Sequence, residues 1–191
     1  MKQRLFDIVI IGAGVIGHSI AFRLKQCRPD ISLAVLGDPM NSLMASRAAA
    51  GMLAPFGECD EADRFFKFCR ESLLQYPDFI EDLICTSGVP VHLSMKGSLI
   101  PSSSFVNGWE KQIRFFREEN VPHQIWSPER CRQLAPVLAE SCGEVIWVGE
   151  GQVNNREMHD ALVTASRKLG VEIFEKNVTG FTRDSSSIGA A

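Results

Sequence analysis

The sequence predicts an α/β fold, and three observations lead to this prediction. The chain has 191 residues with 45% hydrophobic content, enough to bury a core as one domain or as a domain that carries a smaller insertion. An apolar run near the N-terminus breaks into three glycines spaced GxGxxG and then resumes with helical periodicity. A second short apolar run follows, so a strand, a helix and a parallel strand are expected in that order.

The first predicted strand and helix occupy Phe6 to Leu24, read as FDIVIIGAGVIGHSIAFRL. Gly12 allows a sharp turn, Gly14 removes the Cβ that would hold a phosphate off the backbone, and Gly17 lets the helix lie close to the strand. The helix N-terminus then offers free N–H groups and a partial positive charge to an anion. This pattern predicts a Rossmann-like site for a pyrophosphate.

The second strand is predicted over Ile31 to Leu36, read as ISLAVL. In dinucleotide-binding folds, an acidic residue at the end of this strand accepts hydrogen bonds from the adenosine ribose hydroxyls. The chain offers Gly37 and then Asp38 at this position. Asp38 is therefore the candidate for the ribose. Because a proline follows it, a turn is the alternative interpretation.

Further elements are predicted from periodicity and from helix-end signals. An apolar stripe at positions 65, 66, 69, 73, 76, 80 and 83 predicts a helix over 63–84, kinked or split at Pro77. Ser127 is expected to cap a short helix, and Asn154 with Glu157 to form a capping box. Strands are expected at 89–93, 97–100, 144–148 and 171–174, and helices at 105–119 and 154–169.

Charge and residue spacing argue against several partners. A net charge of -3 and a pI near 5.8 leave no basic excess for nucleic acid or an anionic membrane. Asp7 and the glycines interrupt the first apolar run well short of a membrane-spanning length, which favours a strand over a signal peptide. The six cysteines form no CxxC pair and the four histidines are scattered. Reduced thiols, a cytoplasmic location and no metal site are therefore expected.

A second motif lies between Met44 and Cys59, read as MASRAAAGMLAPFGEC. Its alanines and Gly51 would let backbone N–H groups approach a flat ring or a phosphate, and the Ser46 hydroxyl can form a hydrogen bond. A tightly packed helix start is the alternative for this segment taken alone.

Together, GAGVIG and SRAAAGMLAPFGECDEADRFFKFC resemble the FAD-dependent amino-acid oxidase family, and within it the glycine oxidases of thiamine biosynthesis. The segment LVTASRKLGVEIFEKNVTGF at 162–181 is similar to the helix and strand that return to the FAD domain in that family. The resemblance implies an FAD-binding Rossmann-like domain over 1–85 and 151–191, discontinuous and incomplete. A partial α+β substrate domain would be inserted over 86–150.

The resemblance also implies which residues contact FAD. The glycine turn would hold the diphosphate, the strand end the ribose, and the alanine segment would run beside the pyrophosphate and flavin. A valine after the returning strand would contact the adenine. By motif, the FAD-binding residues are Gly12, Gly14, Val15, Ile16, Gly17, Gly37, Asp38, Ala45, Ser46, Ala50, Gly51, Met52 and Val178. Two departures weaken the expected contacts: Gly37 stands where glutamate is usual, and Ala45 replaces a hydroxyl residue.

The activity implied by the resemblance is oxidation of glycine or another small amine or amino acid to the imine, with O2 reduced to H2O2. Members of the family run to nearly twice this length, and the part absent here carries the arginine that grips the substrate carboxylate. Arg47, Arg64 and Arg114 are better interpreted as solvated surface. Neither His92 nor His123 is needed as a base, because hydride transfer from a neutral amine requires none. No catalytic residue is predicted, and the chain alone is expected to be inactive.

Three alternatives stay open. In the first alternative, the chain is another member of the same flavin group, of sarcosine oxidase or glycerol-3-phosphate dehydrogenase type. In the second, it is a non-catalytic truncated or split flavoprotein module, which associates through unpaired sheet edges with itself or with a complementing C-terminal half. An NAD-binding Rossmann domain would explain the first motif but would leave AAAGML unexplained.

Overall fold

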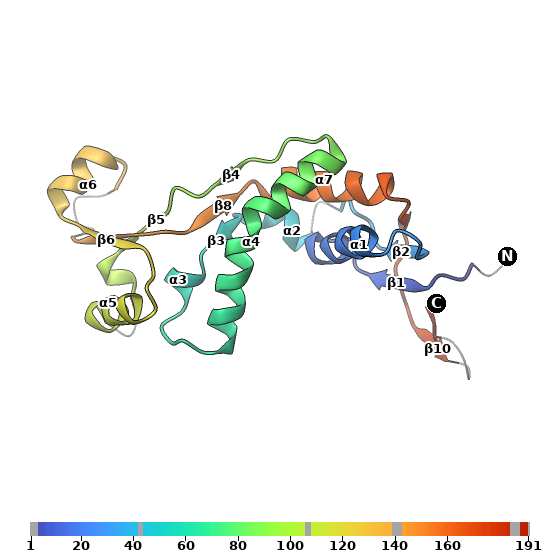
Figure 1. Ribbon diagram of the computed structural model, residues 1–191, viewed down its shortest axis with the longest axis horizontal. Helices are drawn as coiled ribbons and strands as arrows, with labels where there is room; N and C mark the ends of the chain where they lie inside the picture. The colour runs from blue at the N-terminus through green and yellow to red at the C-terminus, as the bar shows by residue number, and fades with distance from the viewer. Residues whose placement is uncertain (1–3, 42–43, 106–107, 139–142, 184–187, 191) are drawn as a thin grey trace. The chain divides into compact units, whose positions relative to one another are not determined.

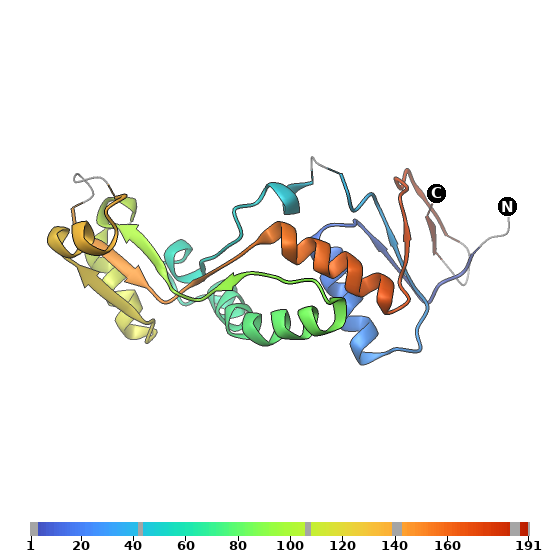
Figure 2. The same cartoon turned by 90° about the horizontal axis from the view of Figure 1, so that it is seen from above.

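The computed structural model describes residues 4–41, 44–105, 108–138, 143–183 and 188–190 (Figures 1 and 2). The chain forms two compact units: the first comprises Met1–Ala50, Ile80–His92 and Asn154–Ala191, and the second comprises Gly51–Phe79 and Leu93–Val153. These units differ from the predicted domains chiefly over residues 51–79, which the sequence analysis placed in the FAD-binding domain and which belong to the second unit. The assignment of a function to each domain stays a prediction.

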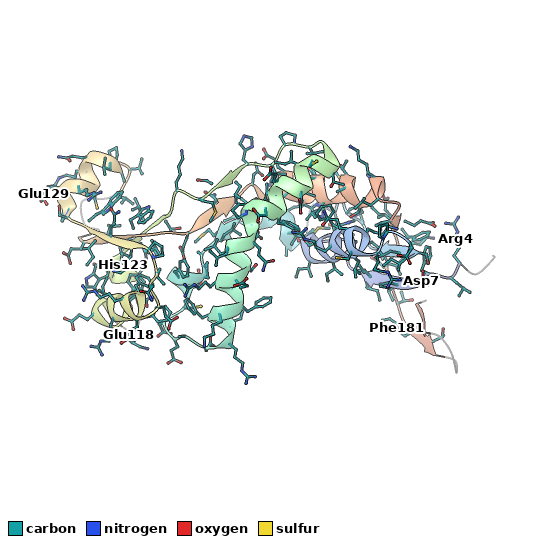
Figure 3. All side chains as sticks on the ribbon, viewed as in Figure 1. Arg4, Asp7, Glu118, His123, Glu129 and Phe181 are labelled. Atoms are coloured by element: carbon teal, nitrogen blue, oxygen red, sulfur yellow. The ribbon has the colours of Figure 1, made fainter. Side chains whose placement is uncertain are left out.

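The first unit contains a parallel sheet in the order β1-β2-β9, formed by Ile8–Ile11, Leu33–Leu36 and Glu172–Phe174. Leu33, Ala34 and Val35 of the central strand are buried, as expected for a parallel strand covered on both faces. Asp7, labelled in Figure 3, accepts hydrogen bonds from the Ser32 N–H at 2.8 Å and the Ser32 hydroxyl at 2.7 Å. These bonds lower the pKa of Asp7 and tie the starts of β1 and β2 together.

Two helices of the first unit, α1 (Val15–Cys27) and α7 (Asn155–Lys168), lie side by side in both ribbon views (Figures 1 and 2). Ala21, Ala161 and Ala165 are fully buried, and side chains of this size allow close helix packing. The Asn154 side chain caps α7 by accepting from the Glu157 N–H, as predicted. The reciprocal half of the capping box was wrong, because the Glu157 carboxylate binds the backbone and ring of His92 instead.

The rest of the first unit consists of short elements. Helix α2 (Ala45–Ala48) follows β2, and the chain ends in an antiparallel hairpin of β10 (Phe181–Arg183) and β11 (Ile188–Ala190). The C-terminal part of α4 (Arg64–Ser87) also belongs to this unit. The sequence did not predict the hairpin.

The second unit contains two antiparallel sheets. One has the order β3-β8-β4, formed by Met52–Leu53, Gly151–Val153 and Leu93–Ser94, and the other has the order β5-β7-β6, formed by Ser98–Pro101, Val145–Val148 and His123–Trp126. The other helices of this unit are α3 (Pro55–Glu58), η1 (Ser102–Ser104), α5 (Trp109–Glu118) and α6 (Pro128–Leu134). Its core is aromatic, with Phe56, Phe66, Phe115 and Phe116 buried together. The mixture of antiparallel strands and helices is the α+β character predicted from the resemblance.

Several predicted boundaries needed correction. The helix expected to kink or split at Pro77 is one continuous element, α4, with Pro77 inside it. Its stripe is buried at Phe66, Leu73, Ile80 and Leu83, whereas Phe65 is 64% exposed. The helix predicted at 105–119 begins only at Trp109, after a 3-10 turn at 102–104. Ser127 caps α6 as expected, accepting a hydrogen bond from the Arg130 N–H.

Candidate cofactor-binding site

The glycine turn between β1 and α1 is held by close backbone contacts, both within the turn and with the end of β2. The Gly12 N–H donates to the Leu36 carbonyl at 2.8 Å, and Gly12 has a φ of 109°. A Cβ on Gly17 would lie 2.0 Å from the Gly12 carbonyl oxygen. A Cβ on Gly37, whose φ is 141°, would lie 2.9 Å from the Ala13 nitrogen. Only glycine allows this approach of backbone to backbone.

The N-terminus of α1 offers N–H groups to a ligand. Gly14 is the N-cap and has no side chain to cap the helix. The Val15 N–H donates to the Ser46 hydroxyl oxygen at 3.0 Å. Within the described ranges, no protein acceptor pairs with the N–H of Gly14, Ile16 or Gly17. Unpaired donors at a helix start, with no Cβ at Gly14, fit a phosphate group.

Helix α7 holds the Ser46 segment beside this turn. The Asn155 side chain donates to the Ser46 carbonyl at 2.7 Å, and Arg156 donates to the Arg47 carbonyl at 3.3 Å. The Arg47 guanidinium pairs with Asp160 of α7 at 2.5 Å. A Cβ on Gly14 would lie 3.0 Å from the Ser46 hydroxyl. The structure therefore brings the two sequence motifs together at Gly14, Val15 and Ser46.

The end of β2 has the geometry of a turn. The Asp38 carboxylate accepts from the Met40 N–H at 2.8 Å, which is the turn interpretation of this residue. The Gly37 N–H donates to the Phe174 carbonyl at 2.9 Å, which continues the pairing of β2 with β9. Asp38 is exposed. Its role toward a ribose stays a prediction.

The other predicted contact residues are distributed over both units. Ala45 begins α2, Ala50 follows α2, and Val178 lies half-buried between β9 and β10. Gly51 and Met52 belong to the second unit, where Met52 pairs with Gln152 and is 61% exposed. Their placement beside a flavin stays a prediction.

Two histidines are buried in the first unit, and the sequence analysis missed them. His159 of α7 contacts the Ala13 carbonyl through Nε2 at 2.9 Å, and His18 of α1 contacts the Ser166 hydroxyl through Nδ1 at 3.1 Å. Both side chains are 0% exposed. Burial lowers the pKa of His18 to about 4, and the charges of His159 and Arg167 act in the same direction. Helical spacing with the apolar Ala21 and Phe22 was the available signal that His18 is buried.

The second unit contains a cavity and a buried carboxylate. The cavity, of about 370 Å³, has mainly apolar walls that include Phe65, Phe68 and Tyr76. Glu150 is fully buried, and its Oε1 accepts from the N–H groups of Phe56 at 2.6 Å and Gly57 at 2.7 Å. Burial raises the pKa of Glu150, and these backbone hydrogen bonds oppose the shift.

The arginines and histidines considered for substrate binding lie in both units. Arg64 and Arg114 lie exposed on α4 and α5. His92 contacts Glu157, and the ring of His123, labelled in Figure 3, donates to the Val121 carbonyl at 2.8 Å. Arg64 and Arg114 thus lie on the surface, and the absence of a catalytic role for the four residues stays a prediction.

Cys27, Cys59, Cys69, Cys85 and Cys131 are free thiols, and Cys142 lies outside the described residues. Over the ranges that the structure describes, no three His, Cys, Asp or Glu side chains gather where they could hold a metal ion. In the same ranges, no helix has both the length and the apolar character needed to cross a membrane.

Comparison with known proteins gives consistent relatives. The chain is 31% identical over 175 residues to the bifunctional protein ThiO/ThiG of Synechocystis sp., covering 91% of this chain and 25% of that protein. It is 30% identical over 176 residues to glycine oxidase of Bacillus subtilis, covering 91% of this chain and 46% of that protein. The chain thus spans a quarter to a half of the length of these curated relatives.

Solved structures share the fold. Glycine oxidase from Geobacillus kaustophilus superposes with a TM-score of 0.87 at 26% identity, over 97% of this chain and 50% of that one. L-α-glycerophosphate oxidase from Mycoplasma pneumoniae, solved with FAD bound, superposes with a TM-score of 0.81 at 16% identity, over 98% of this chain and 50% of that one, a likeness of fold alone. The predicted fold class is confirmed. The family model named FAD dependent oxidoreductase (DAO) matches residues 7–190, so this chain belongs to the FAD-dependent oxidoreductase family.

Proposed function

We propose that this chain forms the FAD-binding part of a glycine oxidase-like enzyme, which oxidises glycine or another small amine or amino acid to the imine and reduces O2 to H2O2. The single observation that carries the proposal is the start of α1, where unpaired N–H groups and the Ser46 hydroxyl surround a position that has no Cβ. The glycine oxidases among the relatives support the substrate class. A cytoplasmic location, supported by the cysteine pattern, is part of the proposal.

The diphosphate of FAD would lie against the start of α1. Its negative charge is stabilised there by the helix dipole and by the N–H groups of Gly14, Ile16 and Gly17. Ser46 accepts from Val15, so its own O–H proton can point to a phosphate oxygen. In the same proposal Asp38 and Gly37 face the ribose, and Val178 faces the adenine. The flavin would lie beside Ala45, Ala50, Gly51 and Met52.

When bound, FAD supplies the two-electron oxidation of the amine and the transfer of electrons to O2. The residues of this chain bind and orient the cofactor. A small substrate also needs an anchor for its carboxylate, for which a bidentate arginine is the usual device. Arg47 already pairs with Asp160. We therefore expect this chain to bind FAD without oxidising glycine by itself.

Reconstitution tests the cofactor half of the proposal. The purified chain is incubated with FAD, passed through a desalting column and examined for bound flavin absorbance. We expect retained flavin in the wild-type chain and loss of it in Gly14→Val, whose side chain would occupy the space next to Ser46. NAD in place of FAD is the competing ligand. A wild-type chain that retains no flavin, or that binds NAD in preference, would contradict the proposal.

A non-catalytic flavin module is the second candidate, favoured by the arginines, because Arg47 pairs with Asp160 and both Arg64 and Arg114 are exposed. Such a module would bind FAD and need a second polypeptide, or a second copy of this chain, to act. Peroxide formation from glycine, FAD and this chain alone would contradict this candidate. Glycine, sarcosine and glycerol-3-phosphate offered to a family-length homologous protein would separate the substrate classes.

A further inference from the structure

We propose that His159 is a positioning residue for the cofactor loop, because it holds the Ala13 carbonyl so that the N–H of Gly14 faces the diphosphate. This inference rests on the proposed function, since it assigns a role toward bound FAD. It concerns a side chain on α7, which lies 146 residues from the glycine motif along the chain.

The contact is buried and has a defined direction. His159 is 0% exposed, and its Nε2 lies 2.9 Å from the Ala13 carbonyl oxygen. A carbonyl only accepts, so the imidazole must donate and Nε2 carries the proton. Nδ1 has no hydrogen-bond partner among the groups that the structure describes. The hydrogen bond to Ala13 is therefore the polar contact that orients this ring.

Planarity of the peptide bond carries the effect to the ligand side. In a trans peptide the C=O and N–H groups point in opposite directions. The carbonyl of Ala13 and the N–H of Gly14 belong to the same peptide unit. Because His159 draws the carbonyl toward α7, the Gly14 N–H is directed away from α7. This is one of the N–H groups with no acceptor in the described part of the protein.

A glycine-rich turn needs such a support more than other turns do. Glycines have no side chain to pack and a wide range of accessible backbone angles. If the peptide between Ala13 and Gly14 rotated, it would present a carbonyl oxygen in place of an N–H and repel a phosphate. A buried hydrogen bond from a packed helix opposes that rotation.

The same helix supports both motifs. Asn155 and His159 are four residues apart on α7, so they lie on one face of the helix. Asn155 holds the Ser46 carbonyl and His159 holds the Ala13 carbonyl. We infer that this face of α7 keeps the Ser46 hydroxyl and the glycine turn in register.

Substitution of His159 tests the inference. His159→Leu removes the donor but keeps an apolar side chain of similar bulk, whereas His159→Gln keeps an N–H donor that can reach Ala13. His18→Leu is the matched control, because His18 is equally buried and meets the His159 ring edge-on at 5.9 Å, but its hydrogen bond goes to Ser166 and not to the turn. The measurements are the dissociation constant for FAD, by quenching of flavin fluorescence, and the melting temperature of the FAD-free chain.

We expect His159→Leu to weaken FAD binding about tenfold, equivalent to about 1.4 kcal/mol, with much of the affinity restored in His159→Gln. His18→Leu should lower the melting temperature and leave FAD affinity within about twofold. Should His159→Leu fail to fold, His159→Asn replaces it in the comparison with His159→Gln, because the shorter amide does not reach the carbonyl.

The outcomes separate the two proposals. Equal FAD affinity in the wild type and in His159→Leu would overturn the inference and leave the proposed function intact. Equal losses in His159→Leu, His159→Gln and His18→Leu would assign the effect to packing and would also overturn it. A wild-type chain that binds no FAD would overturn the proposed function, and this inference with it.

Discussion

The two compact units each bury a polar side chain that holds a backbone turn, but one uses a hydrogen-bond donor and the other an acceptor. In the first unit, His159 is buried and donates to the Ala13 carbonyl. In the second, the Glu150 carboxylate lies beside an aromatic core and accepts from Phe56 and Gly57. The buried residues of the first unit include the small side chains of Ala13, Ala21, Ala161 and Ala165. The second unit instead fills its interior with rings.

The largest expected effect comes from the glycine turn of the first unit. In Gly17→Ala, the new Cβ would lie 2.0 Å from the Gly12 carbonyl oxygen, and neither backbone segment can move without breaking the turn. We expect a loss of more than about 4 kcal/mol in unfolding free energy and no retained flavin, measured by urea denaturation and desalting. Gly180→Ala is the control, since its Cβ would meet nothing within 4 Å. Similar stability of the two variants would contradict this account.

Two adjacent phenylalanines test the aromatic core of the second unit. Phe66 is 0% exposed and its neighbour Phe65 is 64% exposed. We expect Phe66→Ala to cost about 3–5 kcal/mol through cavity formation, and Phe65→Ala to change the unfolding free energy by less than about 0.5 kcal/mol. Urea denaturation of both variants gives the comparison. Equal costs would mean that α4 presents another face to the core.

Acid should weaken the first unit through His18. Its folded pKa of about 4 lies below the ordinary value of 6.5, so the unfolded chain takes up a proton first as the pH falls. Unfolding free energy is therefore lost between pH 6.5 and 4, by about 3 kcal/mol from this residue. His18→Leu should remove that part of the pH dependence. Urea denaturation at pH 7 and pH 4.5 gives the change in unfolding free energy between these pH values. An equal change in the wild type and in His18→Leu would contradict the prediction.

Glu150 should give the second unit the opposite pH dependence. Its folded pKa is raised by burial, so its contribution to stability is present below the unfolded carboxyl pKa and is lost as the pH rises through the folded pKa. Glu150→Gln should therefore be more stable than the wild type at pH 7 but not at pH 4. Glu150→Ala should cost about 1–3 kcal/mol, because two N–H groups lose their acceptor. Destabilisation of Glu150→Gln at pH 7 would show that the carboxylate is ionised and well compensated.

Local requirements were predictable from the sequence, whereas contacts between distant segments were not. Gly12, Gly14 and Gly17 predict a turn, because the requirement for glycine at these positions depends on residues close by in the sequence. The meeting of Ser46 with this turn followed from the resemblance. The link from His159 to Ala13 spans 146 residues, and no local periodicity encodes it. The sequence left two roles for Asp38, a turn and a ribose contact. The structure shows the turn, because the Asp38 carboxylate accepts from the Met40 N–H.

The face of α7 that contains Asn155 and His159 contacts both segments of the proposed cofactor site. Warming that frays this helix would release Ser46 and Ala13 in the same event, so affinity would fall in one step. Loss of bound flavin on heating should then begin at the temperature at which the amides of α7 start to exchange with deuterium.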